Sequence, residues 1–572
     1  MASCFSNYKN LINDKQNRIS FVLLVAFVVL NAVKVSLFNF VLLGDLGRLW
    51  DFIYKLILSI PFSAFFLYLF LNFKKRWIFL SAYILQTAYI FANLAYYLYF
   101  YSYLHIFQWI FLLSEGFTMT ANLMIPVGIE MILIFIDLPL FIYIIIKYNF
   151  VKKIKQPLLL PAILVSVIAV LVFIFSEIYY DANKSLVEKA EPAAINSETV
   201  LVKRYGTVVN EVINVFTNTN EEERVEKVKF GKPYSSEQTK EEFPNIFYIQ
   251  VESLDAGIIY EKYNGEYVAP FLASLREKSV YYPYTLSYHL GGGTSDCEFS
   301  TLNGVEAIAG FPAIKLKSFD FSNSFVHDLK ASGYATYAFH SNEADFFTRD
   351  EAYAKMGYDS FFGIKELELE EKGWGASDGD LFDAAFKKLE NEKGPFFAHI
   401  ITMTSHEPYT NISKIDDTDY FPDILNSEVN NYFNSIKYVD SCIEKFVTEA
   451  LEKYPNSYFY IFGDHCSGIN EEEYAMSSYV LNNKHFELVP TFIITPDKLT
   501  YKEEERVASF RDFALTVLNS AGIKYDILSE GFDLLDFGNI GKEVSFREEY
   551  YDRKVIYENI ASAKYHRDLL KK

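Results

Sequence analysis

The chain has 572 residues, 51% of them hydrophobic, and a formal net charge of -20; this length predicts at least two structural units. The charge is unevenly divided, because residues 1–180 carry +6 and the remainder carries -26. A net charge this negative on residues 181–572 argues against nucleic acid as a partner. The four cysteines lack C-x-x-C spacing and predict neither a zinc knuckle nor a disulfide scaffold.

Long apolar runs dominate residues 1–180. Each is long enough for the roughly 20 residues that cross a bilayer, which predicts an α-helical membrane domain of about five spans. The spans are expected at 20–43, 50–72, 77–103, 128–147 and 157–179. The segment 104–127 is apolar but interrupted, and we interpret it as an interfacial or re-entrant piece rather than a sixth span.

Basic residues orient these spans. One cluster precedes the first span, a second separates the second and third, and a third separates the fourth and fifth. Placing all three clusters in the cytoplasm puts the later chain on the extracellular or periplasmic side of the cell membrane. Residues 181–240 are polar and include the run EEERVEKVK, which predicts a solvated helical linker.

Residues 241–545 are predicted to form an α/β domain, followed by a C-terminal tail at 546–572. Strands are expected at 245–253, 335–340, 395–403, 457–465 and 490–496, and helical stretches lie between several of them. Buried strands that alternate with helices predict a mostly parallel sheet covered on both faces.

Acidic and imidazole side chains stand where two of these strands end. Glu252 closes the first strand, and Asp464 and His465 close the fourth. Sites in α/β proteins lie beyond the carboxyl ends of strands. Two carboxylates and an imidazole suit Mn²⁺, Mg²⁺ or Zn²⁺, so the sequence predicts a metal site at this edge.

The stretch GGGTSDCEFS, residues 291–300, places Thr294 directly after three glycines. Ser295 to Glu298 has the S-x-x-E pattern of a capping box and predicts a helix N-terminus that favours an anion. A metal ion beside Thr294 would lower the pKa of its hydroxyl and make it a nucleophile for phosphorus. His289, just upstream, is interpreted as structural.

Five segments occur in the order expected of the lipoteichoic acid synthase family. They are VES (251–253), GGGTSDCEF (291–299), FHSNEADFFTRDEAYAKMGYDSFF (339–362), ITMTSHEP (401–408) and FGDHCSG (462–468). Over nearly its whole length the chain resembles these membrane-bound phosphoglycerol transferases of the alkaline phosphatase and sulfatase superfamily. The resemblance implies that Thr294 is the nucleophile and that one ion, typically Mn²⁺, is present. The implied metal ligands are Glu252, Thr294, Asp464 and His465.

The same resemblance implies a phosphate and glycerol pocket. Its residues would be His340, Asn342, Phe347, Arg349 and His406, with the Arg349 fork binding the phosphodiester at two points. Asn342 stands where the family usually has Asp and Phe347 where it usually has Trp, so the headgroup is left open. The implied donor is phosphatidylglycerol or a related phospholipid, and the acceptor a glycolipid or polyglycerolphosphate.

Other functions stay open. A phosphoethanolamine transferase shares the five-span plan and the threonine nucleophile. A sulfatase would need C/S-x-P-x-R at the nucleophile, and the stretch around Cys297 lacks both the Pro and the Arg; a two-zinc phosphatase would need further Asp and His ligands. A related sulfatase-like hydrolase and a non-catalytic, membrane-anchored binding protein are further alternatives, although the complete metal set speaks against the latter.

Overall fold

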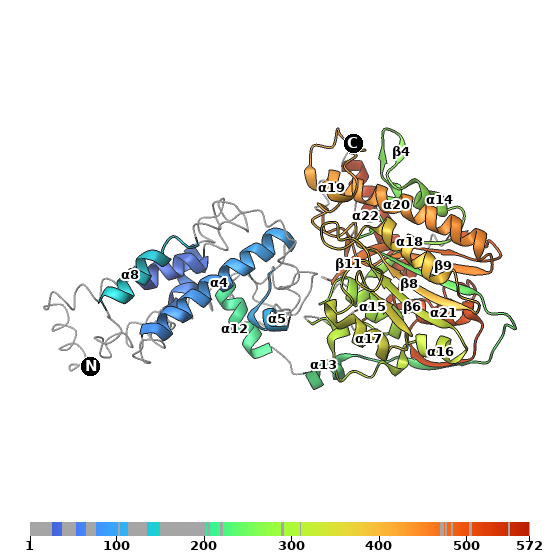
Figure 1. The fold of residues 1–572 in the computed structure, drawn as a ribbon, viewed down its shortest axis with the longest axis horizontal. Coiled ribbons are helices and arrows are strands. Elements are labelled where there is room, and N and C mark those ends of the chain that lie inside the picture. Colours follow the sequence, from blue (N-terminus) through green and yellow to red (C-terminus); the bar gives the residue numbers. More distant parts are fainter. Residues whose placement is uncertain are drawn as a thin grey trace. The chain divides into compact units, whose positions relative to one another are not determined.

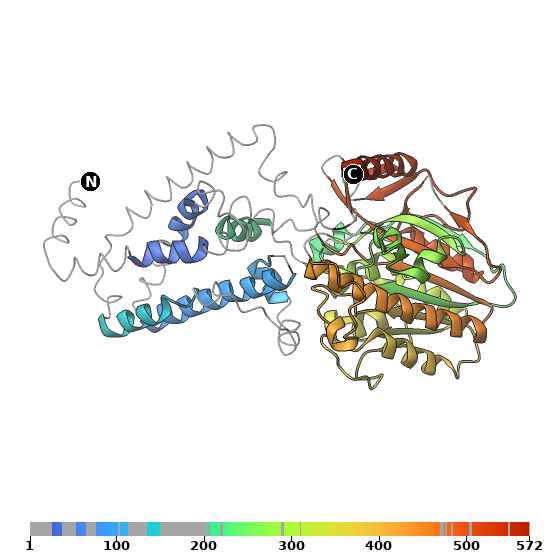
Figure 2. The same ribbon diagram turned by 90° about the horizontal axis from the view of Figure 1, so that it is seen from above.

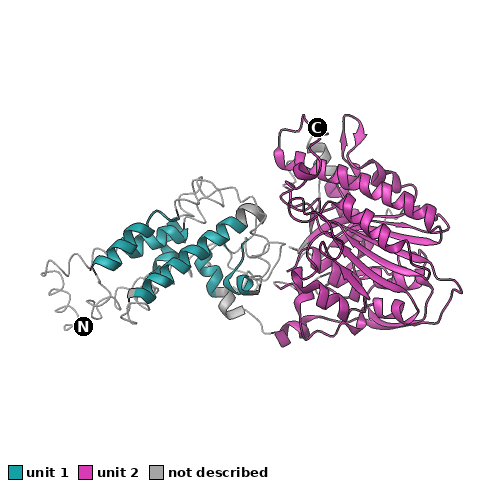
Figure 3. Ribbon diagram, in the orientation of Figure 1, with its two compact units in different colours: residues 1–113, 124–218 teal, residues 114–123, 219–572 magenta. Residues whose placement is uncertain are grey.

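The computed structural model of the chain describes most of the C-terminal part and several helices of the N-terminal part. The described residues are 26–36, 53–63, 76–100, 103–111, 134–148, 202, 206–217, 221–287, 291–308, 311–469, 474, 478–481, 484–502, 506–546 and 549–570. The chain divides into two compact units, one made of residues 1–113 and 124–218 and the other of residues 114–123 and 219–572 (Figure 3).

Apolar helices make up much of the described part of the first unit. Within α4 (Arg76–Phe100), the stretch Trp77–Tyr96 is long and apolar enough to cross a membrane, and it lies inside the predicted span 77–103. Shorter apolar helices inside three other predicted spans are Ala26–Ser36, Ile53–Ser63 and Leu138–Lys147, the last being part of α8 (Leu138–Tyr148). The predicted span 157–179 lies outside the described residues, so a count of five spans stays a prediction.

The segments on either side of these spans are only partly described. Of 104–127, residues 104–111 are described and contain the short helix α5 (Ile106–Phe111). The predicted linker contains α12 (Thr207–Thr217), α13 (Glu221–Lys227) and a strand, β1 (Lys232–Ser236). Because β1 pairs antiparallel with β14 (Tyr525–Ser529), the end of the linker is part of the second unit.

The second unit is built on a ten-stranded sheet, seen in Figures 1 and 2. Its main order is β12-β5-β11-β9-β2-β8-β6-β7, with β10 paired to β11 and β13 to β5. The strands are β2 (Asn245–Val251), β5 (Val280–Ser287), β6 (Ala335–His340), β7 (Ser360–Phe362), β8 (Phe396–Ile401), β9 (Ser457–Gly463), β10 (Ser478–Leu481), β11 (Lys484–Ile494), β12 (Tyr501–Lys502) and β13 (Ala508–Ser509). Two-stranded pairs β3 (Lys262–Tyr263) with β4 (Glu266–Tyr267) and β15 (Glu543–Phe546) with β16 (Glu549–Asp552) lie outside it.

One strand of the sheet runs against the others. The strands β9, β2, β8, β6 and β7 run parallel to one another, whereas β11 is antiparallel to both β9 and β5. Since β12 and β13 run parallel to β5, and β10 runs antiparallel to β11, β11 is the one reversed strand of this sheet among the described residues. The sheet is therefore mostly parallel, as predicted, and mixed only through β11. Between β9 and β11 the described residues include the strand β10 and no crossover helix, and antiparallel neighbours need no crossover.

Helices cover both faces of the sheet. They are α14 (Pro270–Leu275), α15 (Thr294–Asn303), α16 (Val326–Ala331), α17 (Arg349–Lys355), α18 (Asp378–Leu389), α19 (Ile412–Ile415), α20 (Ser427–Lys453), α21 (Asp512–Ala521) and α22 (Arg553–Leu570). Alternate residues of β2 point to opposite faces. Phe247 joins the core formed with α18 and α20, whereas Tyr248 contacts Phe325, beside α16, and Phe513 of α21.

The predicted C-terminal tail is packed into this unit through α22. Arg553, 1% exposed, forms a two-point ion pair with the fully buried Asp512, at 2.7 Å from Nη1 to Oδ2 and 2.8 Å from Nη2 to Oδ1. Ile556 and Ile560 of the same helix are also buried. The tail is thus an integral part of the domain that begins near residue 219.

Candidate metal and phosphate site

Neighbouring parallel strands bring the predicted metal ligands together. Val251 of β2 is the register partner of Gly463 of β9, so the residues that follow, Glu252 and Asp464, leave the sheet side by side. His465 comes next on the β9 side. Ligand atoms of Glu252, Asp464 and His465 lie within 4.8 Å of one another, and all three side chains are buried.

Thr294 joins this cluster from α15. Its Oγ1 donates a hydrogen bond of 2.8 Å to Oε2 of Glu252, and Gln250 donates to its carbonyl at 3.2 Å. Ser253 donates to the other Glu252 oxygen at 2.9 Å. The structure therefore brings together all four residues predicted to share one metal ion.

The donor set fits a cation. Nδ1 of His465 lies 2.9 Å from the carbonyl of Cys466 and must donate to it, which leaves Nε2 of the neutral ring as an acceptor. That Nε2 lies 3.2 Å from Oε1 of Glu252 and 3.7 Å from Oδ2 of Asp464, and the latter oxygen accepts no hydrogen bond from the described residues. An imidazole lone pair facing two carboxylates is stable only with a positive charge between them, as in a metal site.

Titration of the cluster reflects this crowding. Burial raises the pKa of Glu252, but the imidazoles of His406 and His465 outweigh it and hold that pKa below its ordinary value. Burial, together with the Glu252 carboxylate, raises the pKa of Asp464 to about 8. Burial lowers the pKa of His465, but Asp464 and Glu252 raise it well above the ordinary value. The cluster therefore holds protons that a metal ion would displace.

The glycine-rich turn differs from the predicted capping box. The helix α15 begins at Thr294 with Gly293 as its N-cap, at φ 56° and without a side-chain cap. The carboxylate that closes the turn belongs to Asp296, whose Oδ2 accepts from the N–H groups of Gly291 at 2.7 Å and Gly292 at 2.9 Å. The capping-box prediction is wrong because Glu298 turns away from this end to bind Arg349.

Gly291 and Gly292 are needed because other atoms of the chain, and not a ligand, lie close to their α carbons. A β carbon on Gly291 would lie 2.6 Å from the backbone of Phe311, and one on Gly292 would lie 2.2 Å from Oγ of Ser295. With the Gly291 and Gly292 N–H groups bound to Asp296, these two donors serve the fold of the turn. His289 lies outside the described residues.

His340 and His406 are each anchored by a backbone carbonyl. Nδ1 of His340 lies 3.1 Å from the carbonyl of Ile401, and Nδ1 of His406 lies 2.6 Å from that of Glu407. Burial, aided by the charge of Arg349, lowers the pKa of His340 to about 3, so its ring is neutral at neutral pH. Burial also lowers the pKa of His406, although the Glu252 carboxylate opposes this.

Sequence reasoning missed the neighbour of His406. The ring of Trp374 meets the His406 ring edge-on, with centroids 4.3 Å apart. Trp374 stands between Gly373 and Gly375, whose φ angles of 91° and 96° require glycine. The sequence signal was a tryptophan flanked by two glycines, but this pattern does not predict that the tryptophan contacts His406.

The Arg349 fork is used differently from the prediction. Its Nε lies 3.0 and 3.1 Å from the two oxygens of Glu298, and its Nη2 lies 2.6 Å from Oε1. The two-point fork is thus taken by a buried carboxylate that needs a counter-charge, and it is not directed at a phosphodiester. Nη1 makes one long contact of 3.4 Å with the carbonyl of Phe346.

Asn342 and Phe347 follow β6 in the same segment. Oδ1 of Asn342 accepts from the N–H of Glu343 at 2.8 Å, whereas its buried Nδ2 finds no hydrogen-bond partner among the described residues. Phe347 adopts φ 60°, and its half-buried ring lies 5.7 Å from both the Arg349 guanidinium and the Lys315 ammonium.

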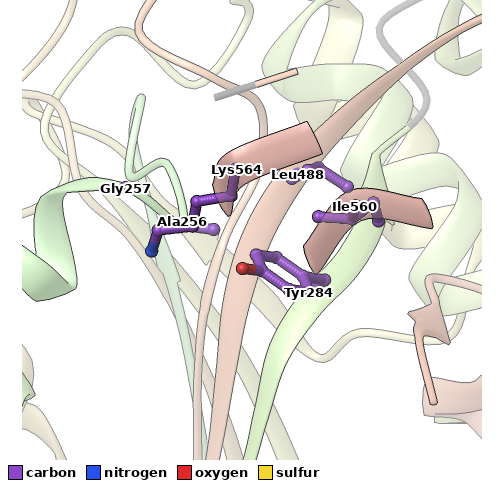
Figure 4. Close-up of a pocket in the computed structure, with 6 residues that line it drawn as sticks. All are labelled: Ala256, Gly257, Tyr284, Leu488, Ile560 and Lys564. Atoms are coloured by element: carbon purple, nitrogen blue, oxygen red, sulfur yellow. The ribbon is translucent and has the colours of Figure 1, made fainter. Parts of the chain in front are cut away.

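A small pocket elsewhere in this unit contains none of the candidate residues. It lies between the start of the loop after β2 and the strands β5 and β11, beneath α22 (Figure 4). Its lining residues are Ala256, Gly257, Tyr284, Leu488, Ile560 and Lys564. We therefore assign the chemistry to the buried polar cluster and not to this pocket.

Comparison with known proteins defines the class of this unit. Residues 244–523 match the family model described as Sulfatase. The integral membrane protein lipooligosaccharide phosphoethanolamine transferase A from Neisseria meningitidis is similar in structure, with a TM-score of 0.56 over 87% of this chain and 95% of its own, at 14% identity. At that identity the likeness concerns the fold. The second unit is therefore a sulfatase-like α/β domain.

Curated sequences narrow the resemblance. Lipoteichoic acid synthase 2 from Bacillus subtilis is 29% identical over 400 residues, which cover 64% of this chain and 61% of the relative. The lipoteichoic acid synthase from Staphylococcus saprophyticus is 32% identical over 293 residues, 49% of this chain and 44% of the relative. The chain thus spans less than two thirds of the length of both. These matches confirm the resemblance to lipoteichoic acid synthases.

Proposed function

We propose that the second unit is a metal-dependent phosphoglycerol transferase. It would move glycerophosphate from phosphatidylglycerol, through Thr294, to a cell-envelope acceptor such as a glycolipid or a polyglycerolphosphate chain. The observation that carries this proposal is the 2.8 Å hydrogen bond from Thr294 to Glu252 within the buried cluster that contains Asp464 and His465. Similarity to lipoteichoic acid synthases supports the choice of substrate class.

Glu252, Thr294, Asp464 and His465 would hold the ion, which we expect to be Mn²⁺, with Mg²⁺ or Zn²⁺ as alternatives. Mixed carboxylate and imidazole donors suit these metals. A bound divalent ion supplies positive charge that lowers the pKa of a neighbouring hydroxyl and neutralises a phosphoryl oxygen. Glu252 also orients the nucleophile, because it accepts the Thr294 proton in a buried hydrogen bond.

The reaction would proceed in two displacements at phosphorus. Oγ1 of Thr294 loses its proton and forms a bond to phosphorus as the bond to the diacylglycerol oxygen breaks, and the leaving oxygen takes that proton. An acceptor hydroxyl then attacks the glycerophosphoryl-threonine and restores Thr294. We assign the proton transfers of these steps to His406, whose ring is held in one orientation by the contact of Nδ1 with the Glu407 carbonyl.

The unpaired amide of Asn342 favours glycerol over ethanolamine as the headgroup. A buried donor without a partner is costly, and a ligand that accepts a hydrogen bond removes this cost. A glycerol hydroxyl can accept from Nδ2. An ammonium group only donates and cannot, which makes a phosphoethanolamine transferase the second candidate.

The experiment compares two isosteric changes on one helix. Thr294→Val removes the proposed nucleophile, and Thr301→Val removes a buried hydroxyl that donates to the Cys297 carbonyl at 2.8 Å. The full chain is incubated with Mn²⁺ and vesicles of labelled phosphatidylglycerol or phosphatidylethanolamine, and diacylglycerol release is followed. We expect release from phosphatidylglycerol by the parent and by Thr301→Val, a glycerophosphoryl adduct on Thr294 by intact mass, and background release by Thr294→Val.

Two results would change the proposal. Parental release by Thr294→Val would replace the threonine by a water nucleophile and make the protein a phosphodiesterase. Preferred cleavage of phosphatidylethanolamine would select the second candidate.

A further inference from the structure

Glu298 is a fully buried carboxylate that the proposed mechanism does not use. It lies on α15, four residues after Thr294, so both side chains project from the same side of the helix. Glu298 accepts from Nε and Nη2 of Arg349, with the shortest distance 2.6 Å, and from the Tyr353 hydroxyl at 2.8 Å. None of these three side chains is more than 3% exposed.

The hydrogen bonds of Glu298 join α15 to α17. Arg349 and Tyr353 are also four residues apart, on α17, so they stand one turn apart and converge on a single carboxylate. Glu298 therefore ties the helix that begins with Thr294 to the helix that begins with Arg349. The side chains of Arg349 and Glu298 are 3% and 0% exposed. Since neither is open to water, each charge is balanced by the other.

Arg349 lies close enough to the candidate site to affect it. Its charge contributes to the lowered pKa values of His340 and His406. With Nε and Nη2 held by Glu298, the guanidinium cannot rotate, and its other edge keeps one orientation. Among the residues that the structure describes, the Nη1 on that edge has only the long 3.4 Å contact to the Phe346 carbonyl.

We infer that Glu298 is a positioning residue that acts through Arg349. It holds the guanidinium so that Nη1 donates to a phosphoryl oxygen, and it links that contact to the helix carrying Thr294. The contact to phosphate is then a single, directed hydrogen bond in place of a two-point fork. The inference rests on the proposed function for the identity of the lipid, but not for the binding of phosphate.

A double-mutant cycle on the full chain tests it. The variants are Glu298→Gln, Arg349→Lys and their combination, with Tyr353→Phe as the matched control, since it removes a hydrogen bond to Glu298 and leaves Arg349 in place. Inorganic phosphate binding is measured by calorimetry in the presence of Mn²⁺, and kcat/KM for diacylglycerol release is measured on phosphatidylglycerol vesicles. Glu298→Asp, which keeps the charge but shortens the side chain, serves if Glu298→Gln does not fold.

We expect Glu298→Gln and Arg349→Lys each to weaken phosphate binding and kcat/KM roughly tenfold or more, with Mn²⁺ affinity unchanged. The double variant should lose no more phosphate affinity and no more kcat/KM than the single variant with the larger loss, because both changes remove the same contact. Tyr353→Phe should stay within about twofold of the parent.

Additive losses in the double variant, or parental phosphate affinity in a folded Glu298 variant, would overturn the inference. An equal loss in Tyr353→Phe would show that helix packing and not Arg349 carries the effect, and would overturn it as well. If the parent binds phosphate but cleaves no lipid, the proposed function fails while the phosphate cycle still decides the role of Glu298.

Discussion

Mn²⁺ binding to the full chain is expected to strengthen as the pH rises from about 6 to about 8. The reason is the crowded pair of carboxyls: burial and Glu252 raise the pKa of Asp464 to about 8, and the pKa of His465 is also raised by its two acidic neighbours. Below pH 8 the cluster therefore binds at least one proton that the metal must displace. One displaced proton weakens binding about tenfold for each pH unit below 8, so the Asp464 proton alone should make the affinity at pH 6 at least roughly a hundredfold lower than that at pH 8.

Calorimetry measures both parts of this prediction. Titrations in two buffers with different ionisation enthalpies give the number of protons released, and the pH series gives the slope. Asp464→Asn should lower Mn²⁺ affinity by about tenfold or more and flatten the slope, because the amide cannot titrate. Asp440→Asn is the control, since this buried carboxyl binds the N–H groups of Phe271 and Leu272, outside the cluster. Binding without proton release, at one affinity from pH 6 to 8, would refute the reasoning.

Three further predictions concern the rest of the chain. Arg553→Met leaves Asp512 buried without its counter-charge and should lower the free energy of unfolding by about 3–5 kcal/mol in denaturant titration; a loss below about 1 kcal/mol would contradict the assigned packing. Gly292→Ala places a β carbon 2.2 Å from Oγ of Ser295 and should impair both folding and lipid cleavage, whereas Gly394→Ala meets no atom within 4 Å and should affect neither. A reporter fused after residue 240 should be active outside the cytoplasmic membrane, and activity confined to the cytoplasm would reverse the predicted orientation.

Strand positions were predictable because a buried strand has a local signature. The apolar runs at 245–253, 335–340, 395–403 and 457–465 correspond to β2, β6, β8 and β9 with ends shifted by at most two residues. The direction of β11 was not predictable. Its sequence, ending PTFII, is as apolar as a parallel central strand, and its antiparallel pairing depends on the connection through β10.

The capping box shows how a local pattern can have two outcomes. Ser295 to Glu298 satisfies the S-x-x-E spacing, yet the N–H groups of the turn are bound by Asp296, which is closer in sequence to the glycines. Glu298 is instead drawn to Arg349, 51 residues further along the chain. A buried carboxylate gains more from a guanidinium than from a cap that Asp296 already provides.

The sequence by itself predicted which residues form the candidate metal cluster. Glu252 and Asp464 each follow an apolar strand, and parallel strands end at the same edge of a sheet, so the sequence predicted the edge at which both carboxylates lie. That the two meet there depends on the adjacency of β2 and β9, with Val251 beside Gly463. Only the tertiary structure decided which partners the remaining polar groups take. The Arg349 fork goes to Glu298, and Nδ2 of Asn342 is left without one among the described residues. Such pairings depend on the distance between side chains from separate elements, and no local pattern of residues encodes that distance.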